Sequence, residues 1–125
     1  EDPRVDVLMH RFNMAHRKAA DEVFPAARKA GTPVIAFTAT RWRTLMAERE
    51  DYSGKLPTAA DCYRYCLAQP AVNLVLTAPQ SVAELEANIS ILDAPVTNAR
   101  EQARWEQFGD LVYGAGDDRF ETEWA

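Results

Sequence analysis

The sequence predicts an α/β fold in which about three parallel strands alternate with crossover helices. Two patterns and the size of the chain support this class. Short apolar runs of strand length alternate with segments whose apolar residues recur at helical spacing. Each candidate strand is almost continuously apolar, as expected for parallel strands that are covered on both faces. The chain has 125 residues, of which 47% are hydrophobic, so it can build one core and is not a disordered chain.

The first strand and the first helix are predicted before residue 32. An apolar segment at residues 5–9 predicts a buried strand. The helical pattern that follows closes at Gly31, a residue suited to the left-handed conformation after a helix. Pro25 lies inside the pattern and removes one intrahelical hydrogen bond, so we expect a kink or two shorter helical pieces. The residues predicted to face the core are Ala20, Val23, Phe24 and Ala27.

The second strand is predicted at residues 32–39, where the sequence TPVIAFTA is apolar and partly β-branched. Residues 40–56 are polar and poorly periodic, which predicts a long loop with one helical turn near Leu45. Loops longer than about 12 residues are uncommon unless they are functional or disordered. The segment is therefore a candidate lid.

The third unit begins with a helix that Thr58 caps, that carries Asp61 in its first turn and that stops near Pro70. Its predicted inner stripe consists of Ala59, Cys62, Tyr63, Cys66 and Leu67. Residues 72–77 (VNLVLT) are the third predicted strand.

Two more helices are predicted after the third strand. Ser81 and Glu84 form a capping-box pattern, and the helix that they open should end at Pro95. Its predicted inner face consists of Val82, Leu85, Ile89 and Leu92. The final helix should run from Thr97 to Val112 and bury Trp105, Phe108 and Leu111. We expect one domain over residues 1–112 and an acidic tail over residues 113–125 that runs over the surface or is loose.

Charge and cysteine content exclude several classes of protein. The net charge of −5 and the scattered basic residues argue against a nucleic-acid-binding module. No apolar run approaches the ~18 residues of a membrane span, and the charged N-terminus contains no secretory signal, so we expect a cytoplasmic protein without a membrane partner. The chain begins with Glu1, which indicates a processed chain or one cut from a longer protein.

Cys62 and Cys66 lie four residues apart, on one face of the predicted helix. A disulfide across one helical turn has poor geometry, and a zinc site would need a second pair of ligands. The two histidines, His10 and His16, show no convincing ligand spacing. We therefore interpret both cysteines as small buried apolar side chains.

Three segments together resemble the aldo/keto reductases. They are DVLMHRFNMAHRKAADEVFP (6–25), PVIAFTATRW (33–42) and PTAADCYRYCLAQPAVNLVLTAPQSVAELEAN (57–88), in the order found in that family. They are similar to its sixth, seventh and eighth βα units, which the C-terminal helix follows. The resemblance covers residues 5–112 and implies a partial TIM (β/α)₈ barrel, because a complete barrel needs about 250 residues.

The resemblance implies NADP-dependent oxidoreductase chemistry, in which a hydride passes to or from a small aldehyde or ketone. The cofactor would lie across the C-terminal ends of the strands. Phe37 matches the aromatic residue that stacks on the nicotinamide, and Asn88 matches the asparagine that contacts adenine. Thr38, Ala39 and Thr40 match the loop along the pyrophosphate, and Ala78, Pro79, Gln80 and Ser81 match the turn that holds the adenosine phosphate at a helix start.

Two positions depart from the family pattern. Met9 stands where many members have a glutamine that binds the nicotinamide carboxamide. Glu84 stands where many have an arginine on the 2′-phosphate, and a carboxylate there would repel that phosphate. NAD therefore remains an alternative to NADP unless Arg41 or Arg43 supplies the missing charge.

The catalytic tetrad of the family is missing. Its aspartate, tyrosine, lysine and histidine come from the first half of the barrel, and Tyr52, Lys55, Tyr63 and Tyr65 do not match those positions. The chain alone would then be inactive, and its expected partner is the N-terminal half of the barrel. The alternative is a stand-alone α/β module that closes its sheet edges by self-association and binds a nucleotide or a protein without catalysis. An unrelated enzyme of flavodoxin-like order is disfavoured, because the chain has no phosphate-loop signature.

Each candidate site residue also has a simpler structural interpretation. Phe37 could belong to the core, Ser81 could serve as a helix cap, and Asn88 could be a solvated helix residue. The residues 41–43 fit a solvated loop, and His10 fits a packed position beside a pocket.

Overall fold

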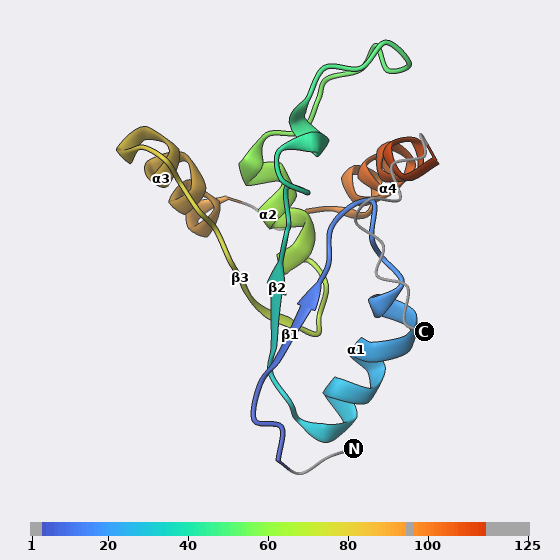
Figure 1. The fold of residues 1–125 in the computed structure, drawn as a ribbon, viewed down its shortest axis with the longest axis vertical. Helices are drawn as coiled ribbons and strands as arrows, with labels where there is room; N and C mark the ends of the chain where they lie inside the picture. Colours follow the sequence, from blue (N-terminus) through green and yellow to red (C-terminus); the bar gives the residue numbers. More distant parts are fainter. Residues whose placement is uncertain (1–3, 95–96, 115–125) are drawn as a thin grey trace.

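The structure, a computed structural model, describes residues 4–94 and 97–114, which form a three-stranded parallel sheet flanked by helices (Figure 1). The strands lie side by side in the order β1-β2-β3, so each crossover places the next strand beside the preceding one, in the same direction across the sheet. This arrangement confirms the predicted α/β class. The elements are β1 (Leu8–Arg11), α1 (Ala19–Ala30), β2 (Val34–Phe37), α2 (Ala59–Leu67), β3 (Val72–Val75), α3 (Val82–Ile89) and α4 (Ala99–Gly114), with 3₁₀ turns at Thr44–Met46 and Ser90–Asp93.

All three strands are shorter than their apolar runs, and the first is shifted toward the C-terminus. Residues 5–7 lie outside β1, whereas His10 and Arg11 lie within it. Hydrogen bonding between strands sets these limits, and an apolar run does not reveal where pairing stops. The register slips between Val34 and Ile35, where the Asn73 side-chain oxygen accepts a hydrogen bond from the Val34 backbone at 2.9 Å.

The two faces of the sheet have different surroundings. Val34 and Ala36 are fully buried in the core, whereas Ile35 and Phe37, which alternate with them along β2, are half-buried. Ile35 pairs with Met9 and Leu74, and these two neighbours are 55% and 45% exposed. One face of the sheet is therefore covered, and the other is open.

An aromatic cluster joins the first two units of the fold. Phe24 of α1 is 1% exposed and meets Phe12 edge-on, with the ring centroids 5.1 Å apart. Phe12 stacks in turn on Tyr65 of α2 at 5.9 Å. The cluster fixes α1 and α2 against the segment that follows β1, so it sets the position of the C-terminal end of that strand.

The end of α1 and the start of α2 agree closely with the sequence signals. Gly31 has a φ of 68° and ends α1. Backbone N–H groups at this helix end donate hydrogen bonds to the carbonyls of Ala27 and Arg28. Thr58 and Asp61 form a complete capping box at the start of α2. Although Pro25 lies within it, α1 is one continuous helix, so of the two expected outcomes, a kink or a division into two pieces, the division is wrong. The buried side chains of Phe24 and Ala27 hold the two halves in the same core, where a single lost hydrogen bond is tolerated.

Two helices bury slightly different residues from those predicted. In α2 the buried side chains include Tyr65, whereas Leu67 is exposed, because the helix presents Tyr65 to Phe12. In α4, Trp105 and Phe108 are buried as predicted, and Val112 takes the place expected for Leu111, which is half-buried.

The largest difference concerns α3. Its apolar residues were expected to face the core, but they are exposed by between 40% and 76%: Val82, Leu85, Ile89 and Leu92. The α-helix also ends at Ile89 and continues as the 3₁₀ turn, and Pro95, the predicted stop, lies outside the described residues. The pattern gives the apolar face of a helix correctly, but it does not say which part of a protein covers that face.

The cysteines are free and buried, as predicted. Burial raises the pKa of the Cys62 thiol to about 12 and raises that of Cys66 as well. Within residues 4–94 and 97–114, no cluster of three or more histidine, cysteine or acidic residues could hold a metal ion. In the same part of the chain, no helix has the length and apolar character needed to cross a bilayer. Most of the predicted acidic tail, residues 115–125, lies outside the described residues.

Candidate functional site

A cleft of about 760 Å³ opens at the C-terminal ends of β2 and β3. Its walls come from the loop after β2, the start of α2, the turn after β3 and the inner side of α3. Of the predicted site residues, it brings together Thr38, Ala39, Thr40, Ala78, Glu84 and Asn88. Segments about forty residues apart in the chain therefore meet at the edge of the sheet where ligands of parallel α/β folds bind.

The loop after β2 has an unusual backbone. Thr38, Arg41, Trp42 and Arg43 have φ values of 56°, 48°, 51° and 70°, in the left-handed region that residues other than glycine rarely adopt. Such conformations persist where the surrounding structure holds them, and they concentrate at functional sites. The Thr38 hydroxyl oxygen is also buried without a hydrogen-bond partner among the described residues.

Asn13 holds this loop in place. It is fully buried, and its amide nitrogen donates a hydrogen bond to the Thr38 carbonyl at 3.0 Å. Its side-chain oxygen accepts hydrogen bonds from the backbone N–H groups of Ala15 and His16 at 3.0 and 2.9 Å. Sequence reasoning missed this residue. The sequence does contain a signal for it: Asn13 comes just after a strand, and asparagine side chains at such positions often hydrogen-bond the backbone of a turn.

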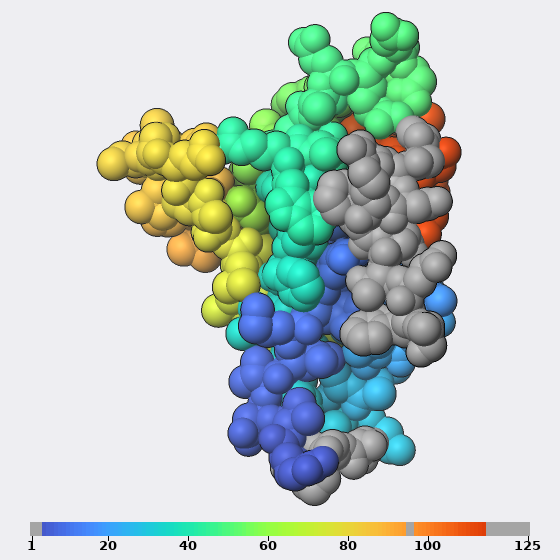
Figure 2. Space-filling view, in the orientation of Figure 1, coloured from blue at the N-terminus to red at the C-terminus, as the bar shows by residue number. Residues whose placement is uncertain are grey.

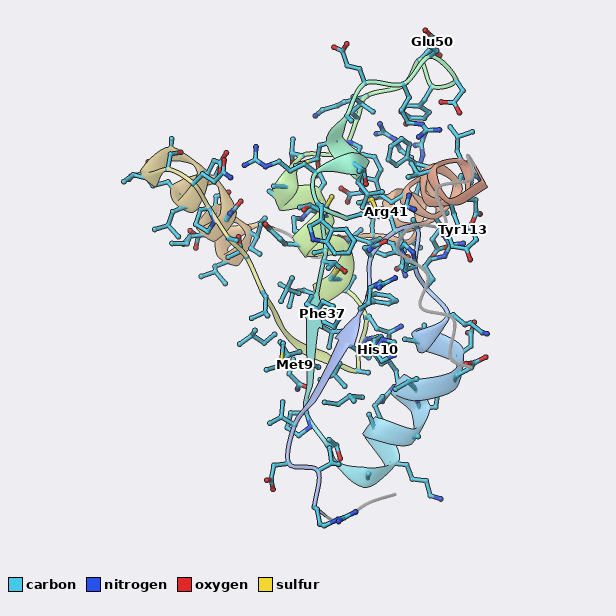
Figure 3. The ribbon with its side chains drawn as sticks, in the orientation of Figure 1. Met9, His10, Phe37, Arg41, Glu50 and Tyr113 are labelled. Carbon is cyan, nitrogen blue, oxygen red and sulfur yellow. The ribbon has the colours of Figure 1, made fainter. Side chains whose placement is uncertain are left out.

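The sequence predicted a solvated loop at Arg41, and for this residue the prediction is wrong. Arg41 is 4% exposed, and its guanidinium donates to the Val112 carbonyl at 3.3 Å, in the last turn of α4 (Figure 3). A cation is favourable at a helix C-terminus. Arg41 therefore fastens the loop to α4, and it is not among the residues that line the cleft.

The N-terminus of α3 forms the opposite wall. The Ser81 hydroxyl accepts a hydrogen bond from the Glu84 backbone at 3.1 Å, which confirms Ser81 as the helix cap. The second hydrogen bond of the predicted capping box, from the Ser81 backbone to the Glu84 carboxylate, is wrong. That carboxylate accepts instead from the Gln80 backbone at 2.8 Å. The same carboxylate also accepts a hydrogen bond from Arg43, across the cleft.

The Arg43 guanidinium and the Glu84 carboxylate form an ion pair with an N–O distance of 2.7 Å. The hydrogen bond from the Gln80 backbone, followed by that from Arg43, lowers the pKa of Glu84 below its usual value. Both side chains remain partly exposed, so the pair adds little to stability. Its main effect is to neutralise both charges where they face the cleft.

A hydrogen-bonded row crosses the floor of the cleft. Asn88, which is 7% exposed, donates to the Thr77 hydroxyl at 2.7 Å, and Thr77 donates to the Tyr63 hydroxyl at 2.9 Å. Asn88 is therefore not a solvated helix residue, because its side chain is buried and donates to Thr77. The row fixes the orientation of its amide group at the cleft wall.

Phe37 lies outside this cleft. It lines a second hollow of about 780 Å³ beside β1, together with Met9, His10 and Arg11 (Figure 3). His10 also packs edge-on against Phe24 at 6.0 Å, which confirms a packed position beside a pocket. Pro79, Gln80 and Ser81 precede α3 but are not among the residues that line the cleft.

The loop over residues 40–56 is anchored at several points. It contains the predicted helical turn, at Thr44–Met46, and Leu45 in that turn is fully buried. Tyr52 packs on Phe108 of α4 with the ring centroids 4.7 Å apart, and Arg104 donates to the Lys55 carbonyl. Glu50 lies at the tip, beyond the C-terminal end of β2 (Figure 3). The structure thus shows a loop that packs against α4 and that contributes Trp42, Arg43 and Met46 to the cleft.

Comparison with known structures finds the same fold in an aldo-keto reductase. The holo form of aldo-keto reductase AKR11C1 from Bacillus halodurans matches with a TM-score of 0.67 and 19% sequence identity, over 84% of this chain and 43% of that one. The apo form of the same protein matches with a TM-score of 0.65 and 20% identity, over 82% and 43% of the two chains. The sequence matches no known family profile, and it matches no curated protein.

The chain thus spans less than half the length of these reductases. Its three parallel strands and their helices correspond to part of a TIM barrel, which confirms the fold that the sequence resemblance implied. In a barrel one face of the sheet is turned inward, and the neighbouring units cover both edges.

Proposed function

We propose that this chain is the C-terminal portion of an NAD(P)-dependent aldo/keto reductase that acts on small aldehydes or ketones. It would contribute cofactor-binding loops and not the catalytic tetrad. The observation that supports this proposal most strongly is the cleft at the C-terminal ends of β2 and β3. There the structure gathers most of the residues that the resemblance assigns to the cofactor.

The cleft offers suitable groups for a dinucleotide. The first turn of α3 leaves backbone N–H groups without intrahelical acceptors, and these can donate hydrogen bonds to the adenosine end of a dinucleotide. Thr38 and Thr40 add hydroxyl groups for the pyrophosphate, while the side-chain oxygen of Asn88 would accept a hydrogen bond from the adenine amino group. Phe37, on the open sheet face, would form the platform for the nicotinamide ring, which carries the hydride when the cofactor is bound.

Three tyrosines of this chain are poorly suited to donate the proton for carbonyl reduction. The Tyr63 hydroxyl accepts a hydrogen bond from Thr77, and the Tyr52 hydroxyl donates to the Lys55 carbonyl at 3.4 Å. Burial raises the pKa of Tyr65 far above its usual range. A general acid needs a pKa near the working pH, so we assign the acid and its partners to the missing half of the barrel.

Cofactor binding provides the direct test. Titration with NADPH or NADH should quench tryptophan fluorescence saturably, because Trp42 lines the cleft and is 53% exposed. The quenching should disappear in Trp42→Phe, whereas calorimetry should still detect binding to that variant. In Trp105→Phe, which changes a tryptophan that is 3% exposed in the core, the quenching should persist. Absence of binding by both methods at millimolar cofactor would overturn the proposal.

We further propose that the N-terminal half of the barrel covers the open faces of this chain. Met9, Leu74 and Leu76 expose about half of their surfaces on the open side of the sheet. Figure 2 shows β1, β2 and β3, in blue, teal and yellow, reaching the near surface of the molecule. Parallel sheets are almost always buried on both faces, so a second layer of polypeptide is expected there.

Dye binding and light scattering distinguish this partner from a second copy of the chain. The isolated chain should bind the hydrophobic dye ANS strongly and associate without fixed stoichiometry. Leu74→Lys should reduce both effects, and Ala26→Lys, on the exposed side of α1, should not. A discrete dimer that does not bind the dye would instead support the self-associating module.

A further inference from the structure

The cleft carries a balanced pair of charges. Among the described residues that line it, the charged ones are Arg43 and Glu84, and they are paired with each other at 2.7 Å. Arg41, the other arginine of the loop, is directed to the end of α4. An additional phosphate dianion in the cleft would therefore find a cation that already has a carboxylate partner.

The position of Glu84 makes this arrangement selective. Its carboxylate is held by the Gln80 backbone and by Arg43, one turn inside the N-terminus of α3. Nucleotide sites commonly use a carboxylate to accept hydrogen bonds from an adenosine ribose with free hydroxyl groups. Sites for a 2′-phosphate commonly provide an unpaired arginine, and a like charge at that point is repulsive.

We propose that the cleft selects a dinucleotide whose adenosine ribose has a free 2′-hydroxyl, and that Glu84 is the residue that excludes the 2′-phosphate. The chain therefore binds NAD(H) in preference to NADP(H). This inference rests on the proposed function, because it requires the adenosine end of the cofactor to lie at the start of α3. Arg43 fixes the Glu84 carboxylate in place and, while paired, does not attract a further phosphate.

Binding of NADH, NADPH, 5′-ADP and 2′,5′-ADP to the full chain tests this inference by calorimetry. The last two probes lack the nicotinamide, so they report on the adenosine end alone. We expect NADH and 5′-ADP to bind at least about tenfold more tightly than their 2′-phosphorylated counterparts. Equal or tighter binding of the 2′-phosphorylated ligands would overturn the inference and leave the proposed function standing. If none of the four ligands binds, the proposed function itself fails.

Two variants identify the residue responsible. Glu84→Gln keeps an acceptor for the Gln80 backbone, and it should reduce the preference about tenfold by freeing Arg43 for the phosphate. Arg43→Gln should leave the carboxylate unpaired and increase the preference. Glu86→Gln, an exposed change in the same helix, should have no effect. An unchanged preference in both Glu84→Gln and Arg43→Gln, with circular dichroism showing folded chains, would contradict the role of Glu84.

Discussion

Replacing Gly109 by alanine is expected to unfold the chain or to destabilise it by more than about 4 kcal/mol. Gly109 is buried in α4, where the helix lies directly on the backbone that follows β1. A Cβ atom at this position would be 1.9 Å from the Met14 carbonyl oxygen and 2.3 Å from the Met14 carbonyl carbon. Because the obstruction is backbone, no side chain can move aside, and α4 would have to separate from the core.

Urea denaturation followed by circular dichroism measures this effect. Gly114→Ala is the matched control, because it makes the same change in the same helix at a point where nothing lies within 4 Å. Alanine is the better helix former, so the control should be neutral or slightly more stable. If both variants unfold at the same urea concentration as the unchanged chain, the docking of α4 on Met14 is wrong.

Replacing Asn13 by alanine should cost about 2–4 kcal/mol of stability and also abolish measurable dinucleotide binding. The substitution leaves the N–H groups of Ala15 and His16 without their side-chain acceptor in a buried region. It also removes one of the two hydrogen bonds to the Thr38 carbonyl, which keeps the one from the Arg41 backbone. Thr38 is also one of the left-handed residues of the cleft loop, so the loop should relax to an ordinary conformation. The positions of Thr38 and Thr40 in the cleft would then be lost.

The control for this second effect is Asn73→Ala. Asn73 is exposed and makes one side-chain hydrogen bond to the Val34 backbone, at the opposite end of β2. We expect a loss of about 1 kcal/mol and retained binding. Binding should be compared under conditions in which each variant is more than nine-tenths folded, so that stability and site geometry are measured separately. Normal cofactor affinity in folded Asn13→Ala would show that the loop does not depend on Asn13.

Most of the secondary structure could be predicted because its causes lie within a few residues of sequence. Gly31 ends α1 because a left-handed residue is needed there, and Thr58 with Asp61 starts α2 by satisfying its free N–H groups. The alternation of apolar runs likewise indicated a parallel sheet. The errors fall where contacts across the chain decide the result, as with Tyr65, which is buried because Phe12 stacks on it, and Leu67, which is not.

The candidate site shows the same division. The resemblance placed Thr38–Thr40, Ala78 and Asn88 at strand ends, and the structure brings them to one cleft. The pairing of Arg43 with Glu84 joins residues that are 41 positions apart, and no local pattern indicates it. An asparagine just after a strand indicates a turn, but the sequence does not reveal that Asn13 contacts Thr38, since that contact depends on the approach of β1 to β2.

The sequence by itself determined the order of strands and helices, the caps, the buried cysteines and the likeness to one part of a barrel. These features follow from backbone conformational preferences and apolar periodicity, which act over one or two turns of chain. Only the tertiary structure decided that Arg41 donates to the C-terminal end of α4 while Arg43 pairs with Glu84. It also decided that one face of the sheet and the apolar side of α3 are exposed. Charge pairing and burial depend on which distant segments meet. The sequence pattern shows that a charged side chain or an apolar face exists, but it does not show what packs against it.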